Sequence, residues 1–322
     1  MLRAVAVLLA LFLTACSSDA PSGAATSAAP VSGVAPQELP EGFGSTAADG
    51  DFPRDVVHFA GTTTIPAQPQ RVVVISTGQL DGVLSLGVTP VGATQASGAD
   101  LVPAYLADAF PDADLTSISS VGLRLEPDLE AVAALQPDLV LVNTVGAESI
   151  GSALAGIAPT VVTEGTGVNW QQDLLLVAAA LGRTDQAQDL LQGLLDDAAQ
   201  VGAGFDGGTV SVVRVSGDRT RIWGTGSFVG SILAAGDVAR PADQQFTETS
   251  RDLSDEELQR AAGDRLFYGV QAGAEDATAL ASPLWTGLPA VADGTAVRVD
   301  DEAWFLNAGP AAARVVLDQL AG

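Results

Sequence analysis

The sequence contains no lysine, and all 14 basic residues of the 322 are arginines. Schiff-base catalysis, a lysine general base and the P-loop of nucleotide-binding proteins all need the lysine amine, so these activities are excluded. Histidine occurs once, at His58, far in sequence from any candidate nucleophile. A Ser-His-Asp triad and a histidine-rich metal site are therefore not expected. A hydrolase would have only carboxylate chemistry, and we interpret His58 as a residue that packs in or beside a strand.

Cysteine also occurs once, at Cys16, after a start with Arg3, an apolar run and the residues Leu-Thr-Ala. This order resembles a bacterial lipobox, in which the cysteine becomes the lipidated N-terminus. It predicts a signal peptide over residues 1–15 and a protein anchored through Cys16 to the extracytoplasmic face of the cell membrane. The alternative is an ordinary signal peptide with an incidental cysteine. Residues 16–50 are rich in small residues and proline, and they predict a flexible linker.

The chain is strongly acidic, with a formal net charge of −25. Such a surface repels phosphate backbones, so we expect no nucleic-acid partner. The length and the apolar share of 47% suit two packed domains rather than one.

The segment 121–144 combines a short amphipathic helix with the apolar strand 138–142, and a second copy covers 253–270. Two copies, within further alternation of short strands and helices, predict an α/β fold of two Rossmann-like lobes with parallel central sheets. We place an N-terminal lobe at 51–184, an inter-lobe helix at 185–203 and a C-terminal lobe at 204–322.

Two local features complete this outline. Residues 55–65 predict a β-hairpin with Gly61 in or near its turn. The long helix is expected to begin at Asp185, whose side chain can cap it with Gln188 as a capping-box partner.

Several arginines and aromatic residues lie at or near expected strand ends, where open parallel sheets bind ligands. They are Arg124, Arg214, Arg219, Arg221, Trp223, Tyr268 and Trp304. Forked guanidinium groups and flat rings suit a bulky, oxygen-rich ligand. The glycine-rich stretch 224–230 is interpreted as a tight loop that exposes helix N-terminal N–H groups to a cleft.

Glu130 and Glu256 occupy matching early-turn positions in the two repeat copies. One interpretation is that they only stabilise their helices, because an early-turn carboxylate interacts favourably with the helix dipole. The other is that they are matching surface carboxylates that meet cations on a two-fold partner.

Taken together, these motifs resemble the iron–siderophore substrate-binding lipoproteins of ABC importers, the family that includes the vitamin B12-binding proteins. The resemblance covers roughly residues 61–320. It rests on Thr64-Ile-Pro66, Pro69-Gln-Arg-Val-Val73, Leu80-Asp81, Leu86-Gly-Val88, Pro90-Val-Gly92, Val121-Gly-Leu-Arg124, Glu126-Pro-Asp-Leu-Glu130, Leu135-Gln-Pro-Asp138, Gly226-Ser-Phe228, Trp304 and Gly309-Pro310.

The resemblance implies the periplasmic-binding-protein fold with a helical backbone between its lobes, and docking of Glu130 and Glu256 onto permease arginines. It implies a monomer that captures a ferric siderophore, whose chelator supplies every iron ligand, so no cofactor or protein-bound metal is expected. Arg124 and Arg214 are the expected contacts to chelate oxygens, and Trp223 and Trp304 the expected walls. Gln79, Ser227 and Tyr268 are further candidates.

A hydroxamate or mixed-type chelate is favoured over a tri-catecholate, which this acidic chain would repel. Haem or cobalamin binding is the alternative within the same fold, with Tyr105 or Tyr268 as an axial ligand for haem. An extracellular hydrolase and a scaffold that has lost transport are the remaining alternatives.

Overall fold

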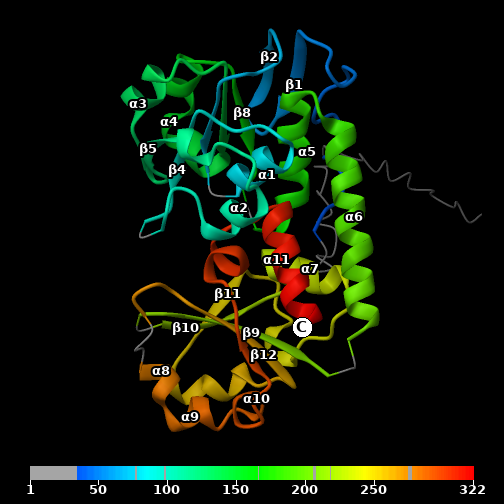
Figure 1. Ribbon diagram of the computed structural model, residues 1–322, viewed down its shortest axis with the longest axis vertical. Coiled ribbons are helices and arrows are strands. Elements are labelled where there is room, and N and C mark those ends of the chain that lie inside the picture. Colours follow the sequence, from blue (N-terminus) through cyan, green and yellow to red (C-terminus); the bar gives the residue numbers. More distant parts are fainter. Residues whose placement is uncertain are drawn as a thin grey trace, which may run out of the picture. The chain divides into compact units, whose positions relative to one another are not determined.

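The computed structural model describes residues 35–322, apart from 77, 98, 166, 206–207, 218 and 275–277. The predicted signal peptide, Cys16 and the first part of the expected linker lie outside these residues. The described residues form one compact unit, built on two large β-sheets (Figure 1). No helix in the described part of the chain is both long and apolar enough to cross a bilayer.

The N-terminal sheet has six strands in the order β6-β5-β4-β3-β7-β8, and all neighbours are parallel except β5 and β6. The strands are β3 Val72–Ile75, β4 Gly92–Gln95, β5 Ser119–Leu123, β6 Glu126–Pro127, β7 Leu139–Asn143 and β8 Thr160–Thr163. Val72 and Val74 pack on one face and Val73 and Ile75 on the other, so β3 is buried on both sides. This confirms the expected parallel α/β unit.

Helices cover both faces of this sheet. The α-helices that cover it are α1 Gln79–Ser85, α2 Ala104–Ala109, α3 Leu129–Ala134, α4 Thr144–Ala155 and α5 Trp170–Leu181. Residues of α1, α2 and α5 share one apolar cluster with the sheet, and residues of α3 and α4 share the other.

The C-terminal sheet is mixed, with the order β11-β10-β9-β12-β13. Its strands are β9 Val210–Ser216, β10 Arg219–Trp223, β11 Ser250–Leu253, β12 Arg265–Val270 and β13 Ala296–Arg298. Only β9, β12 and β13 are parallel, so the second sheet is parallel at its centre as expected but carries two antiparallel strands, β10 and β11, at one edge. The physical reason is the two-residue connection from β9 to β10, because a parallel pair needs a crossover of a dozen or more residues.

Further helices lie in the C-terminal half of the chain. They are α7 Phe228–Ala235, η3 Ala242–Gln244, η4 Asp255–Ala261, α8 Thr278–Ala281, α9 Pro283–Thr286, α10 Pro289–Ala292, the π-helix η5 Glu302–Leu306 and α11 Pro310–Ala321. Helix α11 returns to the N-terminal half, where it packs against α1, α2 and α6, the helix Thr184–Ala203. The largest apolar cluster accordingly runs through residues of both sheets.

The two repeat copies have matching structural roles. The Asp138 carboxylate accepts the backbone N–H groups of Gln70 and Arg71 just before β3, at 2.8 and 2.9 Å. Asp264 accepts the N–H of Thr209 just before β9, at 2.6 Å. The copies differ in their helices, because the first holds an α-helix and the second the 3-10 helix η4.

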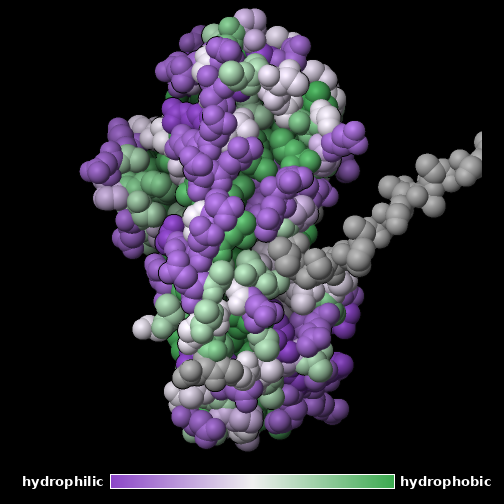
Figure 2. Space-filling view, turned by 90° about the vertical axis from the view of Figure 1, so that its right-hand side faces the viewer, coloured by the Kyte–Doolittle hydropathy of each residue, from purple (hydrophilic) through white to green (hydrophobic). Residues whose placement is uncertain are grey.

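The long helix predicted at 185–203 is α6, with one more residue at its start. Its buried positions include Ala187, Leu191 and Leu194, and hydrophilic residues cover most of the face on which it lies (Figure 2). The expected capping by Asp185 is wrong, because Asp49 accepts the N–H groups of Thr184 and Asp185 at 2.8 and 2.9 Å. A cap from a distant segment leaves no local sequence signal.

The structure of residues 35–50 corrects the prediction of a flexible linker over residues 16–50. Ala35 is 2% exposed and belongs to the main apolar cluster. Gly44 pairs with Val57, and the Gly50 N–H donates to the Gly182 carbonyl. The segment therefore packs on the folded unit and leads into the predicted hairpin, β1 Arg54–His58 and β2 Gly61–Ile65.

Candidate ligand-binding cavity

A cavity of about 190 Å³ has walls from both halves of the chain. The N-terminal half contributes Gln79 at the start of α1, Arg124, and Trp170 and Asp173 in the first turn of α5. The C-terminal half contributes Trp223, Phe228 and the segment 304–310. A complete drug-sized ligand usually occupies about 300–1,000 Å³, so this cavity holds only part of a larger molecule.

The turn between β5 and β6 brings Arg124 to the cavity. Leu123 and Glu126 pair across an antiparallel hairpin, which leaves Arg124 and Leu125 as its two-residue tip. The Arg124 N–H donates to the Gln95 carbonyl at 2.9 Å and fixes the tip against β4. Arg124 is therefore the predicted arginine that the structure places at the cavity.

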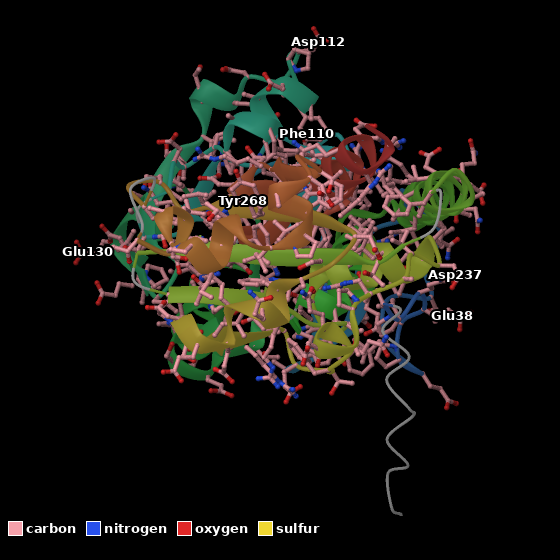
Figure 3. The ribbon with its side chains drawn as sticks, turned by 90° about the horizontal axis from the view of Figure 1, so that it is seen from below. Glu38, Phe110, Asp112, Glu130, Asp237 and Tyr268 are labelled. Atoms are coloured by element: carbon pink, nitrogen blue, oxygen red, sulfur yellow. The ribbon has the colours of Figure 1, made fainter. Side chains whose placement is uncertain are left out.

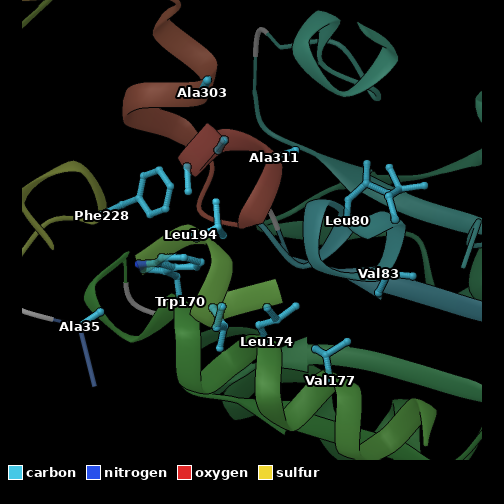
Figure 4. Packing of buried hydrophobic residues seen from close by; sticks show 14 of the residues in the cluster. Ala35, Leu80, Val83, Trp170, Leu174, Val177, Leu194, Phe228, Ala303 and Ala311 are labelled. Carbon is cyan, nitrogen blue, oxygen red and sulfur yellow. The ribbon is translucent and has the colours of Figure 1, made fainter. Parts of the chain in front are cut away.

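Aromatic rings form much of the wall, and Trp223 and Trp304, the two residues expected to wall the ligand, are among the lining residues. The Trp223 ring meets Phe305 edge to face at 4.8 Å, and Trp304 stacks on Phe267 at 5.2 Å. Trp304 is fully buried and its Nε1 donates to Gln319 at 2.6 Å, so it also supports the core. Trp170 and Phe228 form another edge-to-face pair at 5.5 Å, with Leu174 and Val177 following along α5 (Figure 4).

Hydrogen-bond acceptors line the wall formed by α1 and α5. Gln79 is 6% exposed; its Nε2 donates to Thr163 Oγ1 at 2.7 Å, while its Oε1 has no partner. The Asp173 carboxylate accepts the N–H groups of Glu164 and Gly165 at 3.0 and 2.8 Å. Burial raises the pKa of Asp173 to about 7, although these bonds and one from Thr163 act to lower it.

Arg214 does not line the cavity. Its Nε and Nη2 donate to the two carboxylate oxygens of Asp301 at 2.8 and 2.7 Å, and both side chains are largely buried. Arg221 faces it across the β9–β10 pair and lies 5.0 Å over the Trp223 ring. Although Arg214 lies near a strand end, its side chain therefore forms a buried ion pair and is not part of the cavity lining.

Ser227 and Tyr268 also lie outside the cavity lining. Ser227 is fully buried and caps α7, because its Oγ accepts the Gly230 N–H at 3.0 Å and donates to the Gly224 carbonyl at 2.7 Å. Tyr268 packs edge to face on Trp285, on the side of the sheet opposite Phe267.

The expected loop of exposed N–H groups at 224–230 is instead packed against backbone. A Cβ on Gly226 would lie 1.8 Å from the Thr247 carbonyl oxygen, and one on Gly224 would lie 2.3 Å from that of Glu248. Close approach of two backbone segments explains these glycines.

Trp170, Asp173, Phe228 and the segment 305–310 line the cavity without having been predicted from the sequence. Trp170 and Asp173 begin the helix after β8, at the carboxyl end of a parallel strand, and that rule would have pointed to them. Segment 305–310 gives no such signal in the sequence. It reaches the cavity because the chain forms the π-helix η5 and then returns to the N-terminal half as α11.

Glu130 and Glu256 are both exposed and lie in the first turns of α3 and η4. Figure 3 shows Glu130 at the periphery of the molecule. Asp128 caps α3 by accepting the N–H groups of Glu130 and Ala131, both at 3.0 Å, so the Glu130 carboxylate is not the capping group. Within the described ranges, no cluster of three or more His, Cys, Asp or Glu side chains is arranged to hold a metal ion.

Comparison with known proteins gives consistent matches. The profile of the family described as periplasmic binding protein matches residues 72–303. The "Probable siderophore-binding lipoprotein YfiY" of Bacillus subtilis (strain 168) is 35% identical over 288 residues, which cover 83% of this chain and 86% of that protein. The "Fe(3+)-citrate-binding protein YfmC" of the same organism is 26% identical, with 76% and 77% covered. The crystal structure of Staphylococcus aureus SirA complexed with staphyloferrin B matches with a TM-score of 0.70 at 28% identity, covering 83% of this chain and 95% of that one.

Proposed function

The chain belongs to the periplasmic binding protein family, and from this premise we propose that it captures a ferric siderophore outside the cytoplasm and delivers it to the permease of an ABC importer. The observation that carries the proposal is a cavity walled by both halves of a chain that is 35% identical to a siderophore-binding lipoprotein. The role is binding and not catalysis. The chelator would supply the iron ligands, and the protein would need no cofactor of its own.

We propose a hydroxamate or mixed-type chelate as the ligand. Among the cavity-lining residues the ionisable side chains are Arg124 and Asp173, so the wall offers no concentration of cations. A ferric tri-catecholate carries several negative charges, and a chain of net charge −25 would repel it.

Tryptophan fluorescence provides the test, because three of the four tryptophans, Trp170, Trp223 and Trp304, line the cavity. Titration with a ferric trihydroxamate should quench emission strongly. Trp285→Phe is the matched control, since Trp285 packs on the opposite face of the C-terminal sheet and its loss should leave the quenching intact. Tightest binding of a tri-catecholate would contradict the ligand class, and no binding of any ferric chelate would contradict the proposed function.

Haem binding is less well supported, because the residues that could ligate iron lie elsewhere. His58 Nε2 bonds Thr63 at 2.8 Å, Tyr105 is buried against Asp81, and Tyr268 packs on Trp285. None of the three lines the cavity. Added haemin should therefore produce no protein-ligated absorption spectrum, and a shifted Soret band would favour haem.

We further propose that Glu130 and Glu256 dock onto the permease. Their exposed positions in equivalent turns of the two repeat copies support this role. The double substitution to alanine should lower iron uptake while leaving chelate affinity intact. Unchanged uptake would remove the docking role, and a scaffold function would then be favoured.

The protein is proposed to act as a monomer tethered through a lipid on Cys16. Cys16→Ala should release it from the membrane fraction while chelate affinity is retained. Retention of the variant in that fraction would contradict the anchor.

A further inference from the structure

We infer that the cavity wall formed by Gln79 and Asp173 is a subsite for an ammonium group carried by the bound chelate. This inference deepens the proposed function and rests on it. The proposed group is a cationic amine at the end of a ligand arm that extends away from the chelated iron.

Proton positions at Thr163 define the acceptors of this wall. The Thr163 hydroxyl has one proton and bonds both the Asp173 carboxylate and the Gln79 side chain. When Asp173 is ionised its carboxylate only accepts, so the hydroxyl donates to Asp173 and accepts from the Gln79 amide NH₂. The free atom of Gln79 is therefore its Oε1, a buried acceptor without a partner on a residue that lines the cavity.

Asp173 supplies a negative charge to the same wall. Its carboxylate is held by two backbone N–H groups and a hydroxyl, and it forms no ion pair in the part of the chain that the structure describes. Thr163 links the Asp173 carboxylate to the Gln79 amide NH₂, so a charged acceptor and the unpaired Gln79 Oε1 belong to the same wall, and a buried acceptor without a donor is costly. A ligand ammonium would satisfy both oxygens, since it carries three donors and one positive charge.

The surrounding wall suits the alkyl arm that would carry such a group. Trp170, Leu174 and Val177 line the cavity along α5, next to Asp173. Apolar side chains would cover methylene groups, and the Trp170 ring can attract a nearby cation. A cavity of about 190 Å³ is too small for a whole chelate but has room for an arm. The net charge of −25 favours a cationic ligand at long range.

A matched ligand pair tests the inference. Ferrioxamine B is a ferric trihydroxamate with a free terminal ammonium, and N-acetylferrioxamine B is the same chelate with that charge removed. Fluorescence titration should give at least about tenfold tighter binding of the amine form, the order expected for a hydrogen-bonded charge pair. Asp173→Asn should bring the two affinities to within about threefold.

Two further variants distinguish a specific effect at this wall from the effect of the protein's overall negative charge. Gln79→Glu adds a second carboxylate and should increase the preference for the amine. Asp189→Asn removes one exposed carboxylate on α6, with the same change in net charge, and should leave the preference unchanged.

The pH dependence gives an independent readout. The charged group that acts on Asp173 is Glu164, whose pKa burial also raises, and Arg124 is the other ionisable residue of the cavity lining. An ammonium holds Asp173 ionised, so affinity for the amine form should rise from pH 6 to pH 8, while affinity for the acetylated form should not rise.

The outcomes are distinguishable. Equal affinities in the wild type, or a preference that survives Asp173→Asn, would overturn the ammonium subsite and leave chelate capture standing. Failure of both chelates to bind would overturn the subsite together with the hydroxamate proposal.

Discussion

Asp81 should give the protein a component of stability that increases as the pH falls. Its side chain is 1% exposed, and its two oxygens accept the N–H groups of Ala311 and Ala312 at 2.9 Å, at the start of α11. Hydroxyls of Ser85 and Tyr105 bond it at 3.1 and 3.4 Å. Burial nevertheless dominates and raises the pKa of Asp81 from 3.8 to about 6.

The direction of this pH dependence follows from the number of protons that the folded and unfolded states bind at Asp81. Between pH 3.8 and about 6 the folded state holds more protons at Asp81 than the unfolded state, so the free energy of unfolding falls as pH rises through this window. The full shift corresponds to about 3 kcal/mol, of which about 2 kcal/mol is gained on going from pH 8 to pH 4.5.

Urea unfolding of the wild type and Asp81→Asn at several pH values measures this component. The asparagine amide of the variant cannot ionise, while Asp173 and the other carboxyls titrate alike in both proteins. The difference in free energy of unfolding should therefore shift by about 2 kcal/mol in favour of the wild type between pH 8 and pH 4.5. Asp264→Asn is the control with the opposite sign, because hydrogen bonds from Thr209 lower the pKa of Asp264. A difference that stays constant across the range would refute the reasoning.

Three further predictions concern stability. Asp301→Ala leaves the buried Arg214 guanidinium without its carboxylate and should cost about 3–5 kcal/mol in urea unfolding, whereas a loss below about 1 kcal/mol would mean that the pair is solvated. Asp49→Ala removes the cap of α6 and should cost about 1 kcal/mol, and an unchanged unfolding midpoint would contradict that role. Gly226→Ala forces a Cβ to within 1.8 Å of the Thr247 carbonyl oxygen and should lower the melting temperature by several degrees, which calorimetry would detect.

The architecture was largely predictable from the sequence because the local periodicity of apolar residues determines where strands and helices form. Alternating short apolar strands and helices predicted both sheets, and the helix predicted at 185–203 is α6. The matched positions of Asp138 and Asp264 reflect a repeat in structure as well as in sequence. The antiparallel direction of β10 in the second sheet was missed, although the short connection between β9 and β10 contained that information.

The site was predicted less completely, because residue type near a strand end does not determine what a side chain contacts. Tyr268 and Phe267 are neighbours in β12, yet alternation puts only Phe267 on the face that packs against Trp304. Arg214 was expected to bind the ligand, but its guanidinium pairs with Asp301, which is distant in sequence. Asp173 was missed although its helix follows the carboxyl end of β8, and only its hydrogen bonds and burial needed the structure to be seen.

The return of the chain from the second sheet has a mechanical consequence. Helix α6 forms one covalent link between the halves, and residues 307–309 form another before α11 begins on the Asp81 carboxylate. If the two halves move relative to each other, two such links favour rotation about the line that joins them. Because residues 307–309 also belong to the cavity lining, a molecule bound there touches one of the two pivots directly.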